Sequence, residues 1–212
     1  MKPNSSRIAI VLDRSGSMET VRQATIDGFN EFISGQRLVA DECRVRLVQF
    51  NHTVSDVYDL PLADVPPLTL ETFIPGGNTA LFDAMGSTIE SLGNELRKLP
   101  EEQRPEHVIV VTLTDGEENA SKIFDQRMIA YKVGHQRGRY NWEFIFLGAN
   151  QDAVLTAQGF GIPMRAAMTY HSNNIAVRNV MRSTAAYSNS IRSGAQNVAF
   201  SQQDRLDAEV DQ

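Results

Sequence analysis

Five side chains that carry oxygen ligands lie at the borders of expected secondary-structure elements. Asp13, Ser15 and Ser17 occupy alternate positions after one apolar run, Asp115 follows another, and Thr79 follows a pair of glycines. Carboxylates and hydroxyls, without nitrogen or sulfur ligands, are the donors that Mg²⁺ prefers and that Mn²⁺ or Ca²⁺ also accept. If the fold brings these segments together, the sequence predicts a divalent-cation site.

Each of these residues also has a purely structural interpretation. Ser15 or Ser17 could cap the helix that follows, Thr79 could cap another, and Asp115 with Gly116 could form a turn. Helix caps account for the hydroxyls, but they do not account for two acids at the ends of two different buried strands. The combination favours a metal site, and both interpretations stay open at this point.

The apolar runs that must position these residues are short and rich in β-branched or aromatic side chains. We expect strands at 7–12, 43–50, 107–113 and 142–148, an antiparallel edge strand at 51–60, and a last strand at 163–170. The first, third and fourth runs are apolar on both faces, as parallel strands are when helices cover both sides of a sheet.

Segments with helical spacing separate these strands. Helices are predicted at 18–35, 79–99, 122–138 and 172–193, with a short one at 151–161. In the third we expect Phe124, Met128 and Tyr131 to face the core, and Asn173 or Ser172 is the expected N-cap of the helix at 172–193. The alternation predicts an α/β fold, with a doubly wound, mostly parallel central sheet flanked by helices on both faces.

Length and composition limit the function classes. The 212 residues suit a single domain over 1–194, followed by a polar tail over 195–212 that we expect to be frayed or disordered. No apolar run approaches the roughly 20 residues of a membrane helix, and a net charge of -6 without a basic cluster disfavours nucleic-acid binding. The N-terminal residues do not read as a secretory signal, and Cys43 is the only cysteine, so we expect a cytoplasmic location.

The motifs together resemble a known family. The pattern D-x-S-x-S at Asp13, Ser15 and Ser17, the threonine of the glycine-rich loop at Thr79, and T-D-G at Asp115 are similar to the metal-ion-dependent adhesion site (MIDAS) of the von Willebrand factor A domain. The stretches "VLDRSGSM", "VRLVQFN", "GGNTALFDA" and "VIVVTLTDGEENAS" also resemble that family. The likeness covers about residues 7–193 and is greatest to small stand-alone proteins of bacteria and their phages.

The resemblance implies a role for each site residue. Ser15, Ser17 and Thr79 would supply hydroxyl oxygens to Mg²⁺, while Asp13 and Asp115 would bind the ion directly or through water. Such a site keeps an exchangeable water position, which a Glu or Asp carboxylate of a protein partner could fill. The expected function is therefore metal-dependent protein binding without enzymatic activity. In relatives the site couples to the last helix, which makes 172–193 a candidate moving element that hydrogen exchange would test.

Two other functions stay open. Asp13 could be the nucleophile of a Mg²⁺-dependent phosphatase of the haloacid dehalogenase class, although Ser15 stands where those enzymes place a second aspartate. The chain could also be a structural subunit whose metal site is filled by a neighbouring copy, since self-association is compatible with the same chemistry.

The other polar residues have structural interpretations. Glu117 and Glu118 could border the site or cap a helix, and Asp83 is expected to be a helix-end charge. The four histidines show no spacing typical of a zinc site.

Overall fold

The structure is a computed structural model that describes residues 1–149 and 152–210. Its sheet has the strand order β3-β2-β1-β4-β5-β6, and all neighbours are parallel except β2 and β3. The strands are β1 (Lys2–Asp13), β2 (Glu42–Phe50), β3 (Val54–Pro61), β4 (Pro105–Thr114), β5 (Glu143–Ala149) and β6 (Ala167–Tyr170). The predicted mostly parallel sheet with one antiparallel edge strand is confirmed.

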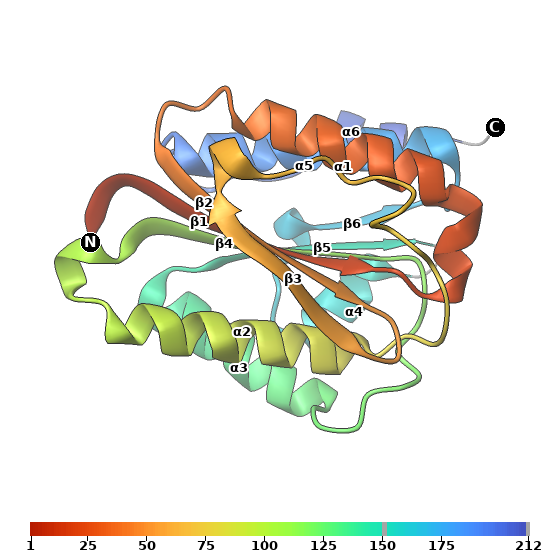
Figure 1. The fold of residues 1–212 in the computed structure, drawn as a ribbon, viewed down its shortest axis with the longest axis horizontal. Helices are drawn as coiled ribbons and strands as arrows, with labels where there is room; N and C mark the ends of the chain where they lie inside the picture. The colour runs from red at the N-terminus through yellow and green to blue at the C-terminus, as the bar shows by residue number, and fades with distance from the viewer. Residues whose placement is uncertain (150–151, 211–212) are drawn as a thin grey trace.

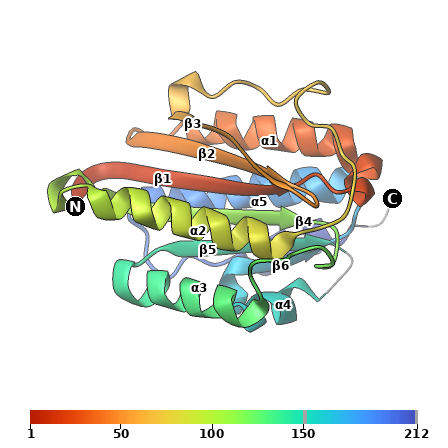
Figure 2. The same cartoon turned by 60° about the horizontal axis from the view of Figure 1, so that its bottom comes forward.

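Helices cover both faces of this sheet. They are α1 (Arg22–Gln36), α2 (Leu81–Lys98), α3 (Gln126–Tyr140), α4 (Ala153–Gly159), α5 (Asn174–Arg192) and α6 (Gln202–Ala208), and a 3-10 turn η1 (Gly16–Val21) precedes α1. Figure 1 shows α1 and α5 on one face and α2 and α3 on the other, and Figure 2 brings α2, α3 and α4 forward. This is the predicted doubly wound arrangement.

Strand β1 lies where the winding changes direction. From β1 the chain passes through α1 to β2 on one side, and it later passes through α2 to β4 on the other side. The interior of β1 is apolar and fully buried, with Ile8 to Leu12 at most 1% exposed. In an open parallel sheet, such a reversal leaves a crevice beyond the carboxyl ends of the two strands. The residues that follow β1 and β4 therefore meet there.

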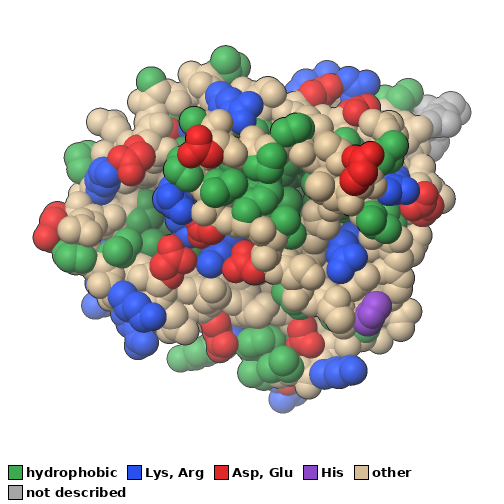
Figure 3. Space-filling model, in the orientation of Figure 1, with side chains coloured by type: hydrophobic (Ala, Val, Ile, Leu, Met, Phe, Trp, Pro, Cys, Tyr) green, Lys and Arg blue, Asp and Glu red, His purple; other side chains and the backbone are tan. Residues whose placement is uncertain are grey.

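The edge of the sheet at β3 carries paired charges. Arg46 of β2 contacts Asp56 at 3.2 Å and Glu95 of α2 at 3.5 Å, while Arg44 contacts Asp59 at 2.9 Å. Figure 3 shows this side of the molecule, where acidic and basic side chains lie next to one another beside a hydrophobic area. Charges on an edge strand oppose pairing with strands of other chains.

Helix α3 differs from the prediction. It begins at Gln126, after Phe124, and it buries Ile129 and Val133 instead of the expected stripe. Met128 is 41% exposed and Tyr131 is 75% exposed, so the prediction was wrong for these two residues, whereas Phe124 is buried as predicted. The reason is that few apolar residues lie on α3, and the pair spaced by four residues packs on the sheet while the larger side chains stay outside.

The C-terminal segment also differs from the expected frayed tail. A capping box between Ser201 and Asp204 starts α6, and the ring of Phe200 lies 4.8 Å from that of Tyr187 on α5. The guanidinium of Arg205 donates to the carbonyl of Ala167, at the free edge of β6. Polar composition suggested disorder, but these specific contacts attach residues 195–210 to the sheet edge.

None of the helices in the described part of the chain has the length and apolar character needed to span a membrane.

The thiol of Cys43 provides a test of the packing at the start of β2. Cys43 is 5% exposed, and burial raises the pKa of its thiol to about 11. Because the thiolate is the reacting form, we expect a disulfide reagent at pH 8 to modify the native protein at least about 100-fold more slowly than the urea-unfolded protein. Absorbance kinetics in buffer and in concentrated urea measure this ratio, and equal rates would contradict the buried position.

Candidate metal site

The carboxylate of Asp13 is fixed at the end of β1. The backbone N–H of Ser15 donates to its Oδ1 at 2.7 Å, and the hydroxyl of Thr114 at the end of β4 donates to its Oδ2 at 2.6 Å. The hydroxyl of Tyr170 on β6 in turn donates to the carbonyl oxygen of Thr114 at 3.1 Å. Three strands thus hold one fully buried acid in place.

The turn after β1 joins this acid to the second one. The hydroxyl oxygens of Ser15 and Ser17 lie 3.1 Å apart, and the hydroxyl of Ser17 donates to Oδ1 of Asp115 at 2.6 Å. Asp115 directly follows β4, which pairs with β1. The structure therefore brings four of the predicted residues into one group.

Thr79 completes the group from the glycine-rich loop. A Cβ added to Gly116 would lie 3.0 Å from Oγ1 of Thr79 and 3.7 Å from Oγ of Ser17. The two hydroxyls thus lie close to the same glycine, next to Asp115, and a larger residue at position 116 would crowd them. The hydroxyls of Thr79 and Ser17 therefore lie near Asp115, and such a group of oxygen donors is suited to a divalent cation.

The capping interpretation of the hydroxyls does not hold in the structure. Ser15 is the N-cap residue of η1, but its side chain makes no capping hydrogen bond. The N-cap of α2 is Ala80, so Thr79 lies one residue before the cap position. The Ser15 and Ser17 hydroxyls instead contact each other, and that of Ser17 contacts Asp115, which helix capping does not require.

The electrostatics of the group also favour a cation. Burial raises the pKa of Asp13 to about 6, hydrogen bonds from Thr114 and Ser15 oppose the rise, and the charge of Asp115 adds to it. Burial likewise raises the pKa of Asp115, against its hydrogen bond from Ser17. A buried carboxylate beside a half-buried one is costly when both are ionised, and a divalent cation between them lowers that cost.

Two asparagines that the sequence analysis did not identify hold the glycine-rich loop. The side chain of Asn119 accepts a hydrogen bond from the backbone N–H of Thr79 at 2.9 Å, and that of Asn51 donates to the carbonyl of Gly76 at 2.6 Å. The backbone N–H of Gly16 also donates to the carbonyl of Gly77 at 3.0 Å. Gly77 has a φ of 80°, a conformation that glycine adopts without strain.

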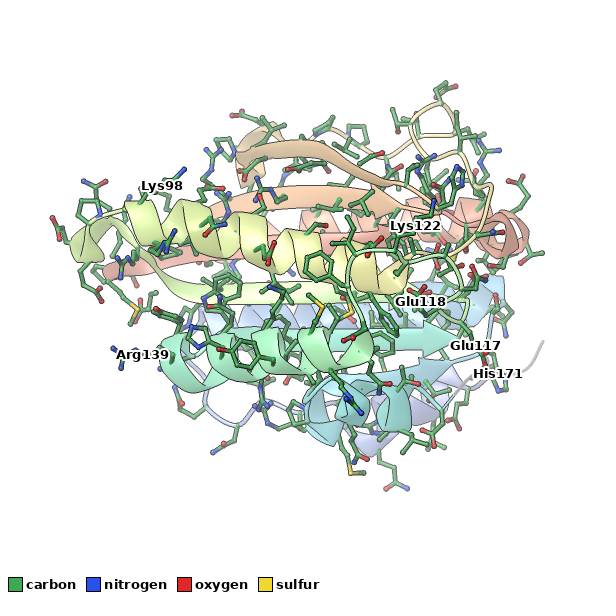
Figure 4. The ribbon with its side chains drawn as sticks, turned by 90° about the horizontal axis from the view of Figure 1, so that it is seen from below. Lys98, Glu117, Glu118, Lys122, Arg139 and His171 are labelled. Atoms are coloured by element: carbon green, nitrogen blue, oxygen red, sulfur yellow. The ribbon has the colours of Figure 1, made fainter. Side chains whose placement is uncertain are left out.

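Acidic residues fix the loop that follows β4. Glu118 accepts hydrogen bonds from the backbone N–H of Phe82 and Ser121, so it joins the loop to the start of α2. Burial opposes the ionisation of Asp83, but backbone N–H donors at 122–124 lower its pKa below the usual value. Figure 4 shows Glu117 and Glu118 at the end of the sheet toward which the strands point. Glu118 therefore holds the loop after β4 against the start of α2. Asp83 was predicted to be a helix-end charge, and it also accepts hydrogen bonds from the backbone of this loop.

Asn119 gives a prediction about metal affinity. Replacing it with alanine removes the acceptor for the Thr79 N–H while leaving the backbone hydrogen bond from 119 to the Thr79 carbonyl. Residues that orient ligands typically contribute 10–100-fold to metal affinity, so we expect a loss of roughly that size in Mn²⁺ titration calorimetry. Asn94→Ala, an exposed asparagine on α2, is the control; an unchanged affinity in Asn119→Ala would contradict the assigned role.

The described residues contain no metal site built from His, Cys, Asp and Glu side chains alone. Across residues 1–149 and 152–210, no three or more His, Cys, Asp or Glu side chains are grouped so that they could hold a metal ion. The Asp13 group differs in kind, because hydroxyl oxygens supply three of its five side-chain donors.

Comparisons with known proteins agree with this geometry. The family model of the von Willebrand factor type A domain matches residues 8–154, which is most of the chain. No curated protein matches the chain in sequence.

Solved structures share the fold at low sequence identity. Proximal thread matrix protein 1 from the mussel byssus has a TM-score of 0.59 at 17% identity, covering 88% of this chain and 46% of that one. The vWF domain of the type V pili tip protein Mfa5 from Porphyromonas gingivalis has a TM-score of 0.59 at 10% identity, covering 92% and 98%. The chain thus spans about half the length of the byssus protein, which has also been solved with a zinc-occupied MIDAS motif.

Proposed function

Because the chain belongs to the von Willebrand factor type A domain family, we propose that it is a metal-dependent protein-binding module and not an enzyme. The main support is the hydrogen bond of 2.6 Å between Ser17 and Asp115, which connects the turn after β1 to the acid after β4. A turn that only starts a helix has no need of a hydroxyl directed to an acid on another strand.

The proposed ligands are the five residues of the MIDAS pattern. Ser15, Ser17 and Thr79 offer hydroxyl oxygens, and Asp13 and Asp115 offer carboxylates, directly or through water. Mg²⁺ is the proposed ion, with Mn²⁺ and Ca²⁺ as alternatives of the same ligand preference. When bound, the ion supplies an electrophilic position that accepts a further oxygen ligand.

The protein's own residues prepare the site for that ligand. Thr114 and the Ser15 N–H hold Asp13 in one orientation, so little reorganisation is needed when a ligand arrives. Two carboxylates leave a divalent ion without surplus negative charge, which favours an anionic ligand from outside. We propose that this ligand is the Glu or Asp carboxylate of a partner protein, because a charge-assisted bond of this kind depends on the metal.

A phosphatase mechanism has less support. A nucleophilic carboxylate must reach the substrate, whereas Asp13 is fully buried, and Ser15 and Thr114 hold it by hydrogen bonds. Ser15 also takes the place of the acid that such enzymes use two residues later. We expect no hydrolysis of p-nitrophenyl phosphate above background with Mg²⁺; activity that Asp13→Asn abolishes would contradict the binding function.

A pull-down from native lysate tests the proposal. The three samples are wild type with Mg²⁺, wild type with EDTA, and Asp13→Ala with Mg²⁺, each checked for folding by circular dichroism. We expect a partner that only metal-loaded wild type retains, and a Glu or Asp substitution in that partner should then release it. Equal retention in all samples would mean that binding uses another surface.

A second copy of the chain is the alternative partner. Two structural relatives are described as a thread matrix protein and a pili tip protein, which supports a role in assemblies. Light scattering of the pure protein with and without Mg²⁺ separates the cases, because self-assembly alone predicts a metal-dependent mass.

Three other conclusions stay predictions from the sequence. They are the domain range 1–194, the small stand-alone bacterial or phage type, and the cytoplasmic location. The byssus and pili relatives give no support to that location, and cell fractionation would test it.

A further inference from the structure

A cavity of about 640 Å³ lies between α2 and α3 at the opposite end of the molecule from the metal site. Its lining includes Val108 near the start of β4, Leu96 near the end of α2, and Trp142 just before β5. Figure 4 shows Lys98 and Arg139 at this end, far from Glu117 and Glu118 at the other. The volume falls within the range of about 300–1,000 Å³ that is typical of small-molecule sites.

Aromatic rings that do not pack in the hydrophobic core border the cavity. The rings of Tyr131 and His135 are stacked with centroids 6.3 Å apart, and the ring of Tyr140 meets that of His135 edge-on at 5.7 Å. Tyr131 is 75% exposed and Tyr140 is 46% exposed. Helix α3 thus presents to solvent Tyr131, which the sequence analysis assigned to the core, together with Tyr140. Exposed π-faces of this kind are platforms on which a planar ring stacks.

The charges that line the cavity leave a positive surplus. Its two acids are already paired, Glu90 with Lys132 at 2.5 Å and Glu101 with Arg104 at 2.9 Å. Among the described residues, no carboxylate pairs with the remaining guanidiniums of Arg97 and Arg139, and that of Arg97 donates only to the side chain of Asn94. A local positive surplus in a chain of net charge -6 favours an anionic ligand.

We propose that this cavity binds a small aromatic anion with the chemistry of a nucleoside monophosphate. The planar base would stack on the rings of α3, and the phosphate would accept hydrogen bonds from Arg97 and Arg139, whose planar guanidiniums match phosphate oxygens. The ligand is a single small molecule and not a nucleic-acid strand, because Arg97 and Arg139 are the two described arginines of the cavity lining without a carboxylate partner, and two cations do not form a continuous basic track. This site is independent of the metal site, since the two share no residue.

Calorimetric titration in EDTA tests the proposal with adenosine, guanosine and uridine 5′-monophosphates. Adenosine and ribose 5-phosphate serve as probes for the separate halves of the ligand. We expect at least one nucleotide to bind, with adenosine and ribose 5-phosphate each bound at least about tenfold more weakly than the nucleotide. Trp142 is the only tryptophan of the chain and lines the cavity, so its fluorescence should change on binding.

Variants distinguish the cavity from nonspecific charge. Arg139→Ala and Tyr131→Ala, both at exposed positions, should each weaken nucleotide binding about tenfold, whereas Arg127→Ala at the start of α3 should not. Asp13→Ala should bind the nucleotide as wild type does, so failure of the metal site would not affect this result. No binding of any nucleotide, equal binding of adenosine, or an equal loss in Arg127→Ala would overturn the proposal.

Discussion

Asp13→Ala is expected to abolish divalent-cation binding, with a loss of at least about 100-fold in Mn²⁺ affinity. Asp13 is a proposed ligand, and it also receives the Ser15 N–H and the Thr114 hydroxyl that order the turn around it. Alanine therefore removes both the carboxylate and its side-chain hydrogen bond to Thr114 at the end of β4. Titration calorimetry with Mn²⁺ measures the loss directly.

The control for this variant is Asp64→Ala, which removes an exposed carboxylate from another part of the molecule. It has the same change in net charge, so an equal loss of affinity in both variants would indicate general charge attraction. Unchanged binding in Asp13→Ala, with native circular dichroism, would remove Asp13 from the site.

Arg192→Ala is expected to give the largest loss of stability. The Arg192 side chain at the end of α5 is fully buried and forms an ion pair with Asp41, which is 4% exposed. Its guanidinium also donates to the backbone carbonyl and the side-chain oxygen of Gln36, each at 2.8 Å. Removing one partner of a buried ion pair leaves the other charge uncompensated, which costs about 3–5 kcal/mol of unfolding free energy.

Urea unfolding of Arg192→Ala and wild type measures this difference. At about 2–4 °C per kcal/mol for a chain of this size, the melting temperature should fall by about 6–20 °C. Arg182→Ala, on the exposed side of the same helix, should change the unfolding free energy by no more than about 0.5 kcal/mol. A loss below about 1 kcal/mol for Arg192→Ala would mean that water reaches the pair.

The sequence was sufficient to predict the positions of residues that lie next to strand ends or within one turn. Asp13 ends one buried strand and Asp115 follows another. Because the strands are parallel, their carboxyl ends lie at the same edge of the sheet, so the strand pattern predicts that the two acids lie at that edge. Ser15 and Ser17 share a turn with Asp13, and in the structure the Ser15 N–H donates to Asp13 while the Ser17 hydroxyl donates to Asp115. Asn173 was one of two expected N-caps of α5, and its side chain does accept from the first backbone N–H groups of that helix.

The residues that the sequence did not reveal act across long separations. Asn119 contacts Thr79 from 40 residues away, and Tyr170 contacts Thr114 from 56 residues away. No local pattern marks an asparagine or a tyrosine as the partner of a distant backbone group. These contacts become visible only when the loops are packed together.

Weak local signals account for the two differences in the fold. Helix α3 has too few apolar residues for its periodicity to identify the buried face, so Met128 and Tyr131 were assigned to the wrong side. The segment from Ala195 looked unstructured because its composition is polar, yet Phe200 and Ala208 are buried against the sheet edge. Two buried side chains and a helix cap are enough to order such a segment once the rest of the fold exists.

The water-proton relaxation rate of Mn²⁺ bound to the protein tests the central claim most directly. The account predicts that wild type enhances the relaxation, because the five ligands leave a position for a rapidly exchanging water, and that Asp13→Ala gives no enhancement. Loss of the enhancement when a Glu-containing partner peptide is added would identify that position as the binding site. Mn²⁺ that is not bound, or Mn²⁺ bound without an exchangeable water, would contradict the account.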